Sequence, residues 1–145
     1  MKVSVPKLPD LNGFHVLVVD DNEDTREILQ SFFTHLGAVV TVATNGSEGL
    51  AALKEVLAHV IVSDLSMPGI DGYEFMRRVR ALPGEAQHPT PAIAITGFVQ
   101  REDRERALRS GYQSFIAKPA DPLFVAQEVA RLGRRPPAEK RRRAS

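Results

Sequence analysis

Short apolar runs alternate with amphipathic stretches along most of the chain. Residues 16–19 are four consecutive apolar residues that lead directly into Asp20 and Asp21. An apolar run bounded by polar residues predicts a strand buried on both faces, as in parallel sheets. Four later runs have the same character, at residues 38–43, 60–64, 92–96 and 114–117.

The segments between these runs have the spacing and the boundary residues of helices. The first carries apolar residues at helical intervals up to Leu36 and ends at Gly37, and the second covers residues 45–57. The third follows the turn sequence at residues 67–72, and the fourth, at about residues 101–110, is mostly charged. The last has Asp121 as N-cap and Pro122 at its first position, and it stops at Gly133. Strands and helices that alternate in this way predict a single α/β domain with a parallel five-stranded sheet.

Polar side chains stand where the predicted strands end. Asp20 and Asp21 follow the first strand, Asp64 ends the third, Thr96 ends the fourth and Lys118 follows the fifth. Ligands of open α/β sheets bind beyond the carboxyl ends of the strands. We therefore expect these five side chains to project into one crevice.

The residue types in this crevice indicate its chemistry. Adjacent carboxylates repel one another unless a cation lies between them, and a small pocket of carboxylate oxygens suits Mg²⁺. A hydroxyl group and a lysine beside them suit an incoming phosphoryl group. An aspartate can itself be the nucleophile, and Asp64 is best placed for that role. Taken alone, Asp20–Asp21 or Asp64 would be explained as well by negative charge at a helix N-terminus.

Composition restricts the class of protein. The chain has 145 residues and no cysteine, which excludes disulfides, thiolate zinc sites and cysteine nucleophiles. We find no transmembrane stretch and no signal peptide, and we expect a cytoplasmic protein. From Arg131 onward, seven basic residues face one acidic residue, a net +6, so the rest of the chain carries −5 of the total +1. We predict that residues 134–145 form a disordered, solvated tail, with nucleic-acid or acidic-membrane binding as the alternative.

The chain resembles response-regulator receiver domains of two-component signalling over residues 11 to about 133. The blocks VLVVDDNED, VIVSDLSMPGIDGYEF, AIAITG and SFIAKP stand in the order of that family, at the expected ends of the strands. The resemblance implies a flavodoxin-like, doubly wound (βα)5 fold with strand order 2-1-3-4-5. It also implies a phosphoacceptor domain of a phosphorelay that assists its own phosphorylation and dephosphorylation and is not an enzyme.

Carried over residue by residue, the resemblance assigns a metal site and a phosphoacceptor. Asp64 would accept the phosphoryl group from a phosphohistidine. Asp21 would bind Mg²⁺ directly, Asp20 would assist through water, and Asp64 and the backbone carbonyl of Ser66 would complete the set of ligands.

The same resemblance assigns the residues that respond to phosphorylation. Thr96 and Lys118 would contact the phosphoryl oxygens. Thr96 and Phe115 would form a switch that changes the face made by the fourth helix, the fifth strand and the fifth helix. A cis peptide bond between Lys118 and Pro119 would turn the lysine side chain into the crevice.

The resemblance also bears on domains and partners. Residues 1–10 would be an N-terminal extension before the receiver domain at residues 11–133. LPDLNGFHVLVVDD and AITGFVQREDRERALRSGYQSFIAKPADP are similar to receivers at the C-terminal end of hybrid sensor histidine kinases, so we expect a stand-alone receiver of that lineage or an excised piece. The expected partners are a histidine kinase or histidine phosphotransfer protein and an effector, with no DNA-binding domain and no membrane segment. A weak dimer is a further option.

Three alternatives compete with this interpretation. A phosphatase with an aspartate nucleophile needs a second aspartate two residues later, where this chain has Ser66 after Asp64 and Asn22 after Asp20. A degenerate receiver would act only as an interaction module, but the five strand-end residues are all present. A nucleic-acid regulator would rely on the basic tail, and no helix-turn-helix supports it.

Overall fold

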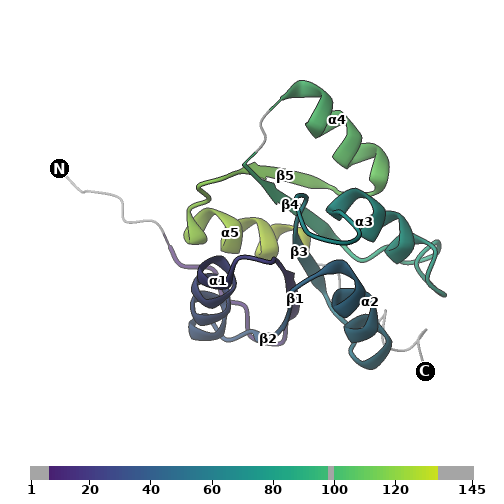
Figure 1. Ribbon diagram of the computed structural model, residues 1–145. Coiled ribbons are helices and arrows are strands. Elements are labelled where there is room, and N and C mark those ends of the chain that lie inside the picture. The colour runs from purple at the N-terminus through teal and green to yellow at the C-terminus, as the bar shows by residue number, and fades with distance from the viewer. Residues whose placement is uncertain (1–6, 98–99, 134–145) are drawn as a thin grey trace.

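Five parallel strands form one sheet in the order β2-β1-β3-β4-β5 in the computed structural model of the chain (Figure 1). The structure describes residues 7–97 and 100–133. In chain order, the elements are β1 His15–Val19, α1 Glu23–His35, β2 Val39–Ala43, α2 Gly46–Glu55, β3 Val60–Asp64, α3 Gly72–Arg80, β4 Ala92–Thr96, α4 Arg101–Ser110, β5 Ser114–Ala117 and α5 Pro122–Leu132. The flavodoxin-like α/β fold and the strand order that we expected are confirmed.

Helices cover both faces of the sheet, with α1 and α5 on one side and α2, α3 and α4 on the other (Figure 1). Alternate residues of each strand point to opposite faces. Val16 and Val18 of β1 therefore pack in the core beside α1 and α5, whereas Leu17 and Val19 pack in the core on the other face. β3 and β4 are buried along their whole length, which explains why their sequences are apolar up to the last residue.

Short polar side chains begin four of the five helices. Asn22, Asn45, Asp71 and Asp121 each occupy an N-cap position and accept a hydrogen bond from a backbone N–H of the following turn. These bonds satisfy N–H groups that have no partner inside the helix. Since each cap directly follows the loop after a strand, the caps fix where the chain turns at the carboxyl edge of the sheet.

Several predicted boundaries differ from the structure by one or two residues. The helix that we expected over residues 45–57 ends at Glu55, because Val56 has an extended backbone (φ −127°, ψ 149°) that redirects the chain toward β3. The second strand begins at Val39 instead of residue 38. At this turn Gly37 has φ +106°, a conformation that residues with a side chain rarely adopt.

The charged helix α4 is tied to α3 by polar and aromatic contacts. The guanidinium carbon of Arg106 lies 4.0 Å from the centre of the Tyr73 ring. The Tyr73 hydroxyl lies 3.5 Å from the backbone and side-chain oxygens of Asp103. Only Ala107 and Ser110 of α4 are buried. This helix is therefore held by side-chain contacts to α3 more than by a broad apolar face.

The two predicted terminal segments are only partly covered by the described residues. Residues 7–10 of the expected N-terminal extension are described, and the predicted tail at residues 134–145 lies outside the described range. Leu11 is fully buried, and its N–H donates to the carbonyl oxygen of Leu36 at 2.9 Å. Within the described ranges, no helix has the length and apolar character needed to cross a membrane.

Candidate functional site

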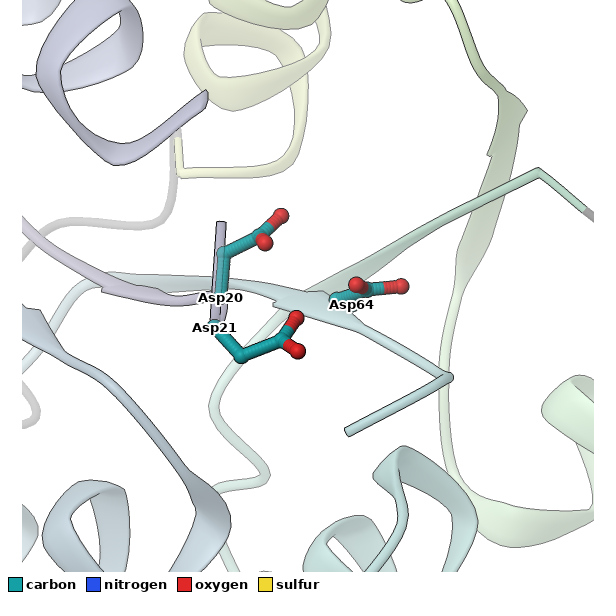
Figure 2. A group of neighbouring side chains, drawn as sticks. All are labelled: Asp20, Asp21 and Asp64. Carbon is teal, nitrogen blue, oxygen red and sulfur yellow. The ribbon is translucent and has the colours of Figure 1, made fainter. Parts of the chain in front are cut away.

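Three carboxylates converge at the carboxyl edge of the sheet. Asp20 and Asp21 follow β1, and Asp64 is the last residue of β3. The two strands are neighbours, and the pairing of Val19 with Ser63 places Asp20 beside Asp64. One oxygen from each of the three side chains lies within 4.8 Å of the others (Figure 2). Asp20 and Asp64 are buried, whereas Asp21 is exposed.

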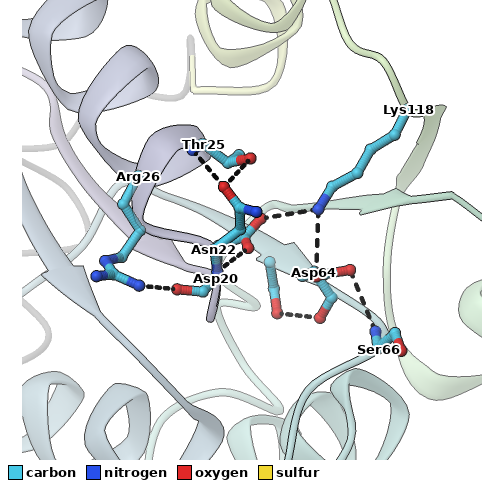
Figure 3. Close-up of polar contacts among 8 residues, drawn as sticks. Asp20, Asn22, Thr25, Arg26, Asp64, Ser66 and Lys118 are labelled. Atoms are coloured by element: carbon cyan, nitrogen blue, oxygen red, sulfur yellow. Dashed lines mark hydrogen bonds and ion pairs between the residues drawn. The ribbon is translucent and has the colours of Figure 1, made fainter.

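Lys118 brings a positive charge to two of these carboxylates. Its Nζ lies 3.3 Å from Oδ2 of Asp20 and 3.3 Å from Oδ2 of Asp64 (Figure 3). The backbone N–H of Lys118 donates to the carbonyl oxygen of Thr96 at 2.7 Å. The following peptide bond, to Pro119, is cis, which is the geometry that the family resemblance implied. The lysine thus reaches from the end of β5 across β4 to β3 and β1.

Backbone N–H groups hold the buried carboxylates in place. Oδ1 of Asp20 accepts the N–H of Asn22 at 2.8 Å, and Oδ1 of Asp64 accepts the N–H of Ser66 at 3.1 Å (Figure 3). The side chain of Asn22 accepts the N–H of Thr25 at 2.9 Å and so begins α1. Each buried aspartate therefore has one oxygen on a backbone donor and the other on the ammonium group of Lys118.

The environment changes the pKa values of two of these groups. Burial raises the pKa of Asp64, and the negative charge of Asp20 acts in the same direction. The Ser66 N–H and the Lys118 ammonium oppose this rise without cancelling it. For Lys118, burial disfavours the charged form, but the attraction of Asp64 and Asp20 outweighs burial and leaves the pKa above its ordinary value. The site therefore combines a lysine whose charged form is favoured with a buried carboxyl group whose charged form is disfavoured.

The remaining predicted residues border this group. Thr96 is fully buried at the end of β4, one residue beyond the pairing of Ile95 with Asp64. Phe115 on β5 is partly buried and packs against the core beside α2, α3 and α4. The structure thus brings Asp20, Asp21, Asp64 and Lys118 into one cluster, with Thr96 and Phe115 on the two following strands.

Two neighbours of the site were not singled out from the sequence. Asn22 could have been found, because an asparagine just before an apolar periodic segment is a typical N-cap. Arg26 gave no such signal. Its Nη1 donates to the backbone carbonyl oxygen of Asp20 at 2.8 Å (Figure 3), a contact that depends on how α1 is set against the end of β1.

The charges and donor atoms of the cluster fit a divalent cation. Its three carboxylates and one ammonium group carry a formal net charge of −2. Carboxylate oxygens are the ligands that hard cations such as Mg²⁺ prefer. A cation of this kind would relieve the repulsion that Lys118 compensates only in part.

Known proteins with a similar sequence or structure share this architecture. A family described as response regulator receiver domain matches residues 16–130. A 14.6 kDa uncharacterized protein from Leptolyngbya boryana is 49% identical over 115 residues, which cover 79% of this chain and 86% of that protein. A protein-glutamate methylesterase/protein-glutamine glutaminase from Myxococcus xanthus is 36% identical over 81% of this chain, but this chain spans only 33% of its length.

A solved structure extends the comparison. The receiver domain of a sensor histidine kinase from Pseudomonas aeruginosa, determined with a magnesium ion coordinated in its active-site cleft, has a TM-score of 0.75 and 26% identity. The match covers 83% of this chain and 98% of that structure.

The raised pKa of Asp64 predicts a pH-dependent stability. Below the pKa of Asp64 in the unfolded chain, close to 3.8, the carboxyl group is neutral in both states and its burial does not lower the stability. Above the raised pKa of the folded state, the group is charged in both states and the penalty is fully present. We expect metal-free Asp64→Asn to have a larger free energy of unfolding than wild type at about pH 7, with little difference near pH 3. Urea unfolding at both pH values measures this difference.

A matched control is Glu102→Gln, which removes one exposed carboxylate from α4. It should leave the stability nearly unchanged, as most exposed substitutions do. An Asp64→Asn variant that is less stable than wild type at neutral pH would contradict this account of the Asp64 environment.

Proposed function

The chain belongs to the response regulator receiver domain family, and on that premise we propose that Asp64 accepts a phosphoryl group from a phosphohistidine in the presence of Mg²⁺. Receiver domains are signalling modules of two-component systems. The observation that carries the proposal is the cluster itself, in which the Asp64 carboxylate lies beside two further aspartates and 3.3 Å from the Lys118 ammonium. The donor would be a histidine kinase or a histidine phosphotransfer protein.

The transfer needs a carboxylate nucleophile and compensation of charge. An oxygen of Asp64 forms a bond to phosphorus while the bond between phosphorus and the imidazole nitrogen of the donor breaks, and the electron pair of that bond returns to the imidazole. The reaction leaves an acyl phosphate on Asp64. Where the leaving imidazole would be anionic, it takes a proton from water, so the donor histidine ends neutral. Lys118 would neutralise part of the charge on the phosphoryl oxygens, and the Thr96 hydroxyl would donate to one of them.

Four groups would hold the metal. Asp21 would bind it directly, Asp20 would assist through water, and Asp64 and the Ser66 carbonyl would complete the protein ligands. When bound, Mg²⁺ supplies charge neutralisation between the carboxylates and the incoming phosphoryl group. The donor set of this chain and the magnesium ion in the related Pseudomonas aeruginosa receiver support this assignment.

Phosphorylation would be read out through Thr96 and Phe115. A phosphoryl group adds a charge of about −1.5 to −2 and three acceptor oxygens. An inward movement of Thr96 toward these oxygens would leave space beside β4 that Phe115 can fill. Since phenylalanine has no hydroxyl group, packing alone would balance its two positions. The face that changes is formed by α4, β5 and α5, and a downstream effector would bind there.

We infer a signalling role without enzymatic turnover of a separate substrate, because the group that reacts is Asp64 of the chain itself. The domain would still assist its own phosphorylation and dephosphorylation through Lys118 and the metal. The identity of the effector would be set by side chains of the α4, β5 and α5 face. The two helices of this face carry one exposed large apolar residue each, Leu108 on α4 (46% exposed) and Phe124 on α5 (51% exposed).

The transfer is tested with a small phosphodonor. Wild type should take up phosphate from acetyl phosphate, and should bind beryllofluoride, only when Mg²⁺ is present. Asp64→Asn should take up none, because an amide is not a nucleophile for this reaction. Intact-mass spectrometry measures the addition. Phosphate on another residue at a comparable yield would refute the role of Asp64.

The metal assignment is tested with two neighbouring acidic residues. We expect Asp21→Asn to lower the Mg²⁺ affinity by about tenfold or more, in line with the loss of a charged ligand worth at least ~1.4 kcal/mol. Glu23→Gln removes an exposed carboxylate of α1 and should change the affinity little. Calorimetric titration compares the two variants, and equal losses would exclude a specific role for Asp21.

The switch is tested by removing the Thr96 hydroxyl. Thr96→Ala should still bind beryllofluoride with Mg²⁺. The amide chemical shifts of α4, β5 and α5 should respond much less than in wild type, because the variant lacks the hydroxyl group that would move toward the phosphoryl mimic. Wild-type shift changes confined to the loops around Asp64 would show that this switch does not operate.

A further inference from the structure

The peptide group between Asp20 and Asp21 is held by a side chain from α1. Nη1 of Arg26 donates a hydrogen bond of 2.8 Å to the carbonyl oxygen of Asp20 (Figure 3). The backbone N–H of Arg26 in turn donates to the carbonyl oxygen of Asn22 at 3.1 Å. The carbonyl that Arg26 holds belongs to the peptide bond that leads into Asp21. The orientation of this peptide group therefore sets the direction of the backbone at Asp21.

Asp21 depends on this backbone more than the other two aspartates do. The carboxylates of Asp20 and Asp64 are each fixed by a backbone N–H and by Lys118. Among the described residues, the Asp21 carboxylate has no comparable hydrogen bond or ion pair, and the residue is exposed. One of its oxygens nevertheless lies within 4.8 Å of the ligand oxygens of the other two (Figure 2). Its place in the cluster therefore depends on the path of the Asp21 backbone.

We propose that Arg26 is a positioning residue that directs Asp21 toward the metal site by holding the Asp20–Asp21 peptide group. This inference rests on the proposed function, in which Asp21 binds Mg²⁺ directly. Arginine suits the task because its guanidinium group remains charged and presents its N–H donors in a fixed plane. A charge-assisted bond to the carbonyl oxygen also resists competition from water. Groups that orient metal ligands from the second layer commonly control metal affinity in this way.

The charge of Arg26 and its hydrogen bond have opposite effects on Mg²⁺ binding. A positive charge near three carboxylates repels an incoming cation, so its removal alone would increase the affinity. Loss of the hydrogen bond frees the peptide group and spreads the Asp21 carboxylate over more positions, which decreases the affinity. The sign of the change therefore separates a positioning residue from a nearby charge.

The experiment uses the full chain with Arg26→Met and Arg26→Leu, which both remove the charge and the N–H donors and both favour helix. We expect the Mg²⁺ dissociation constant, from amide chemical shifts, to rise about tenfold, the lower end of the usual effect because lost repulsion offsets part of it. Arg26→Lys, which keeps the charge and replaces the guanidinium group with an ammonium donor, should recover part of the loss. The matched control is Arg131→Met on α5, which loses an ion pair to Glu128 and should bind Mg²⁺ like wild type.

A second measurement needs no metal. In metal-free protein, ¹⁵N relaxation should give a lower order parameter for the Asp21 amide in Arg26→Met than in wild type, with little change in β3 or β5. The proposal is overturned if the folded Met and Leu variants bind Mg²⁺ as tightly as wild type or more tightly. It is also overturned if the Lys variant recovers nothing, or if Asp21 stays equally ordered. A wild-type protein that does not bind Mg²⁺ would instead contradict the proposed function.

Discussion

Repulsion between carboxylates at the ends of β1 and β3 is the constraint around which the site is built. Asp20 and Asp64 are both buried, and removing a charged carboxylate from water is unfavourable unless it is paired. The compensating charge comes from Lys118, which follows β5. Because β5 is separated from β3 by β4 and is an edge strand of the sheet, the pair can be compensated only after the whole carboxyl edge has assembled.

Contacts with neighbouring elements hold the turn that follows Asp64. Gly72 approaches the β3–α3 turn so closely that a Cβ atom there would collide with the carbonyl oxygen of Asp64. Its N–H donates to Leu65, and its carbonyl oxygen accepts the hydroxyl of buried Tyr112 at 2.8 Å. Burial also raises the pKa of Tyr112, so this hydroxyl remains a donor. The end of the loop after Asp64, where α3 begins, is thus connected directly to the turn before β5.

A second set of contacts connects this region to α4. Tyr73 lies in α3, one residue after Gly72, and contacts Arg106 and Asp103 of α4. The contacts are polar and aromatic, and they lie between helices with few buried side chains on the α4 side. Elements held by few buried apolar contacts are the ones that change position most easily. The fold therefore combines a buried Asp64, held by the Ser66 N–H and by Lys118, with a neighbouring helix that has few buried side chains.

Local patterns in the sequence were sufficient to predict the helices and strands and to identify the side chains at the strand ends. Alternation of apolar runs with capped helices predicts a parallel sheet, and in such a sheet every strand ends at the same edge, so Asp20, Asp64 and Lys118 had to lie near one another. The exact end of α2 at Glu55 was not predicted, because the extended Val56 follows from the path of the chain to β3.

The contacts that give the site its geometry were decided by the tertiary structure. Lys118 and Asp64 are separated by 54 positions in the chain, and no local pattern specifies that one ammonium group bridges two aspartates. The same holds for the hydroxyl of Tyr112 on Gly72, 40 positions away. Even Arg26, only six positions from Asp20, reaches the Asp20 carbonyl oxygen because packing of α1 against the sheet sets the angle between helix and strand. The sequence by itself determined which groups reach the carboxyl edge, through the periodicity of each element. Their distances, partners and charge balance depend on packing between elements, which no single segment contains.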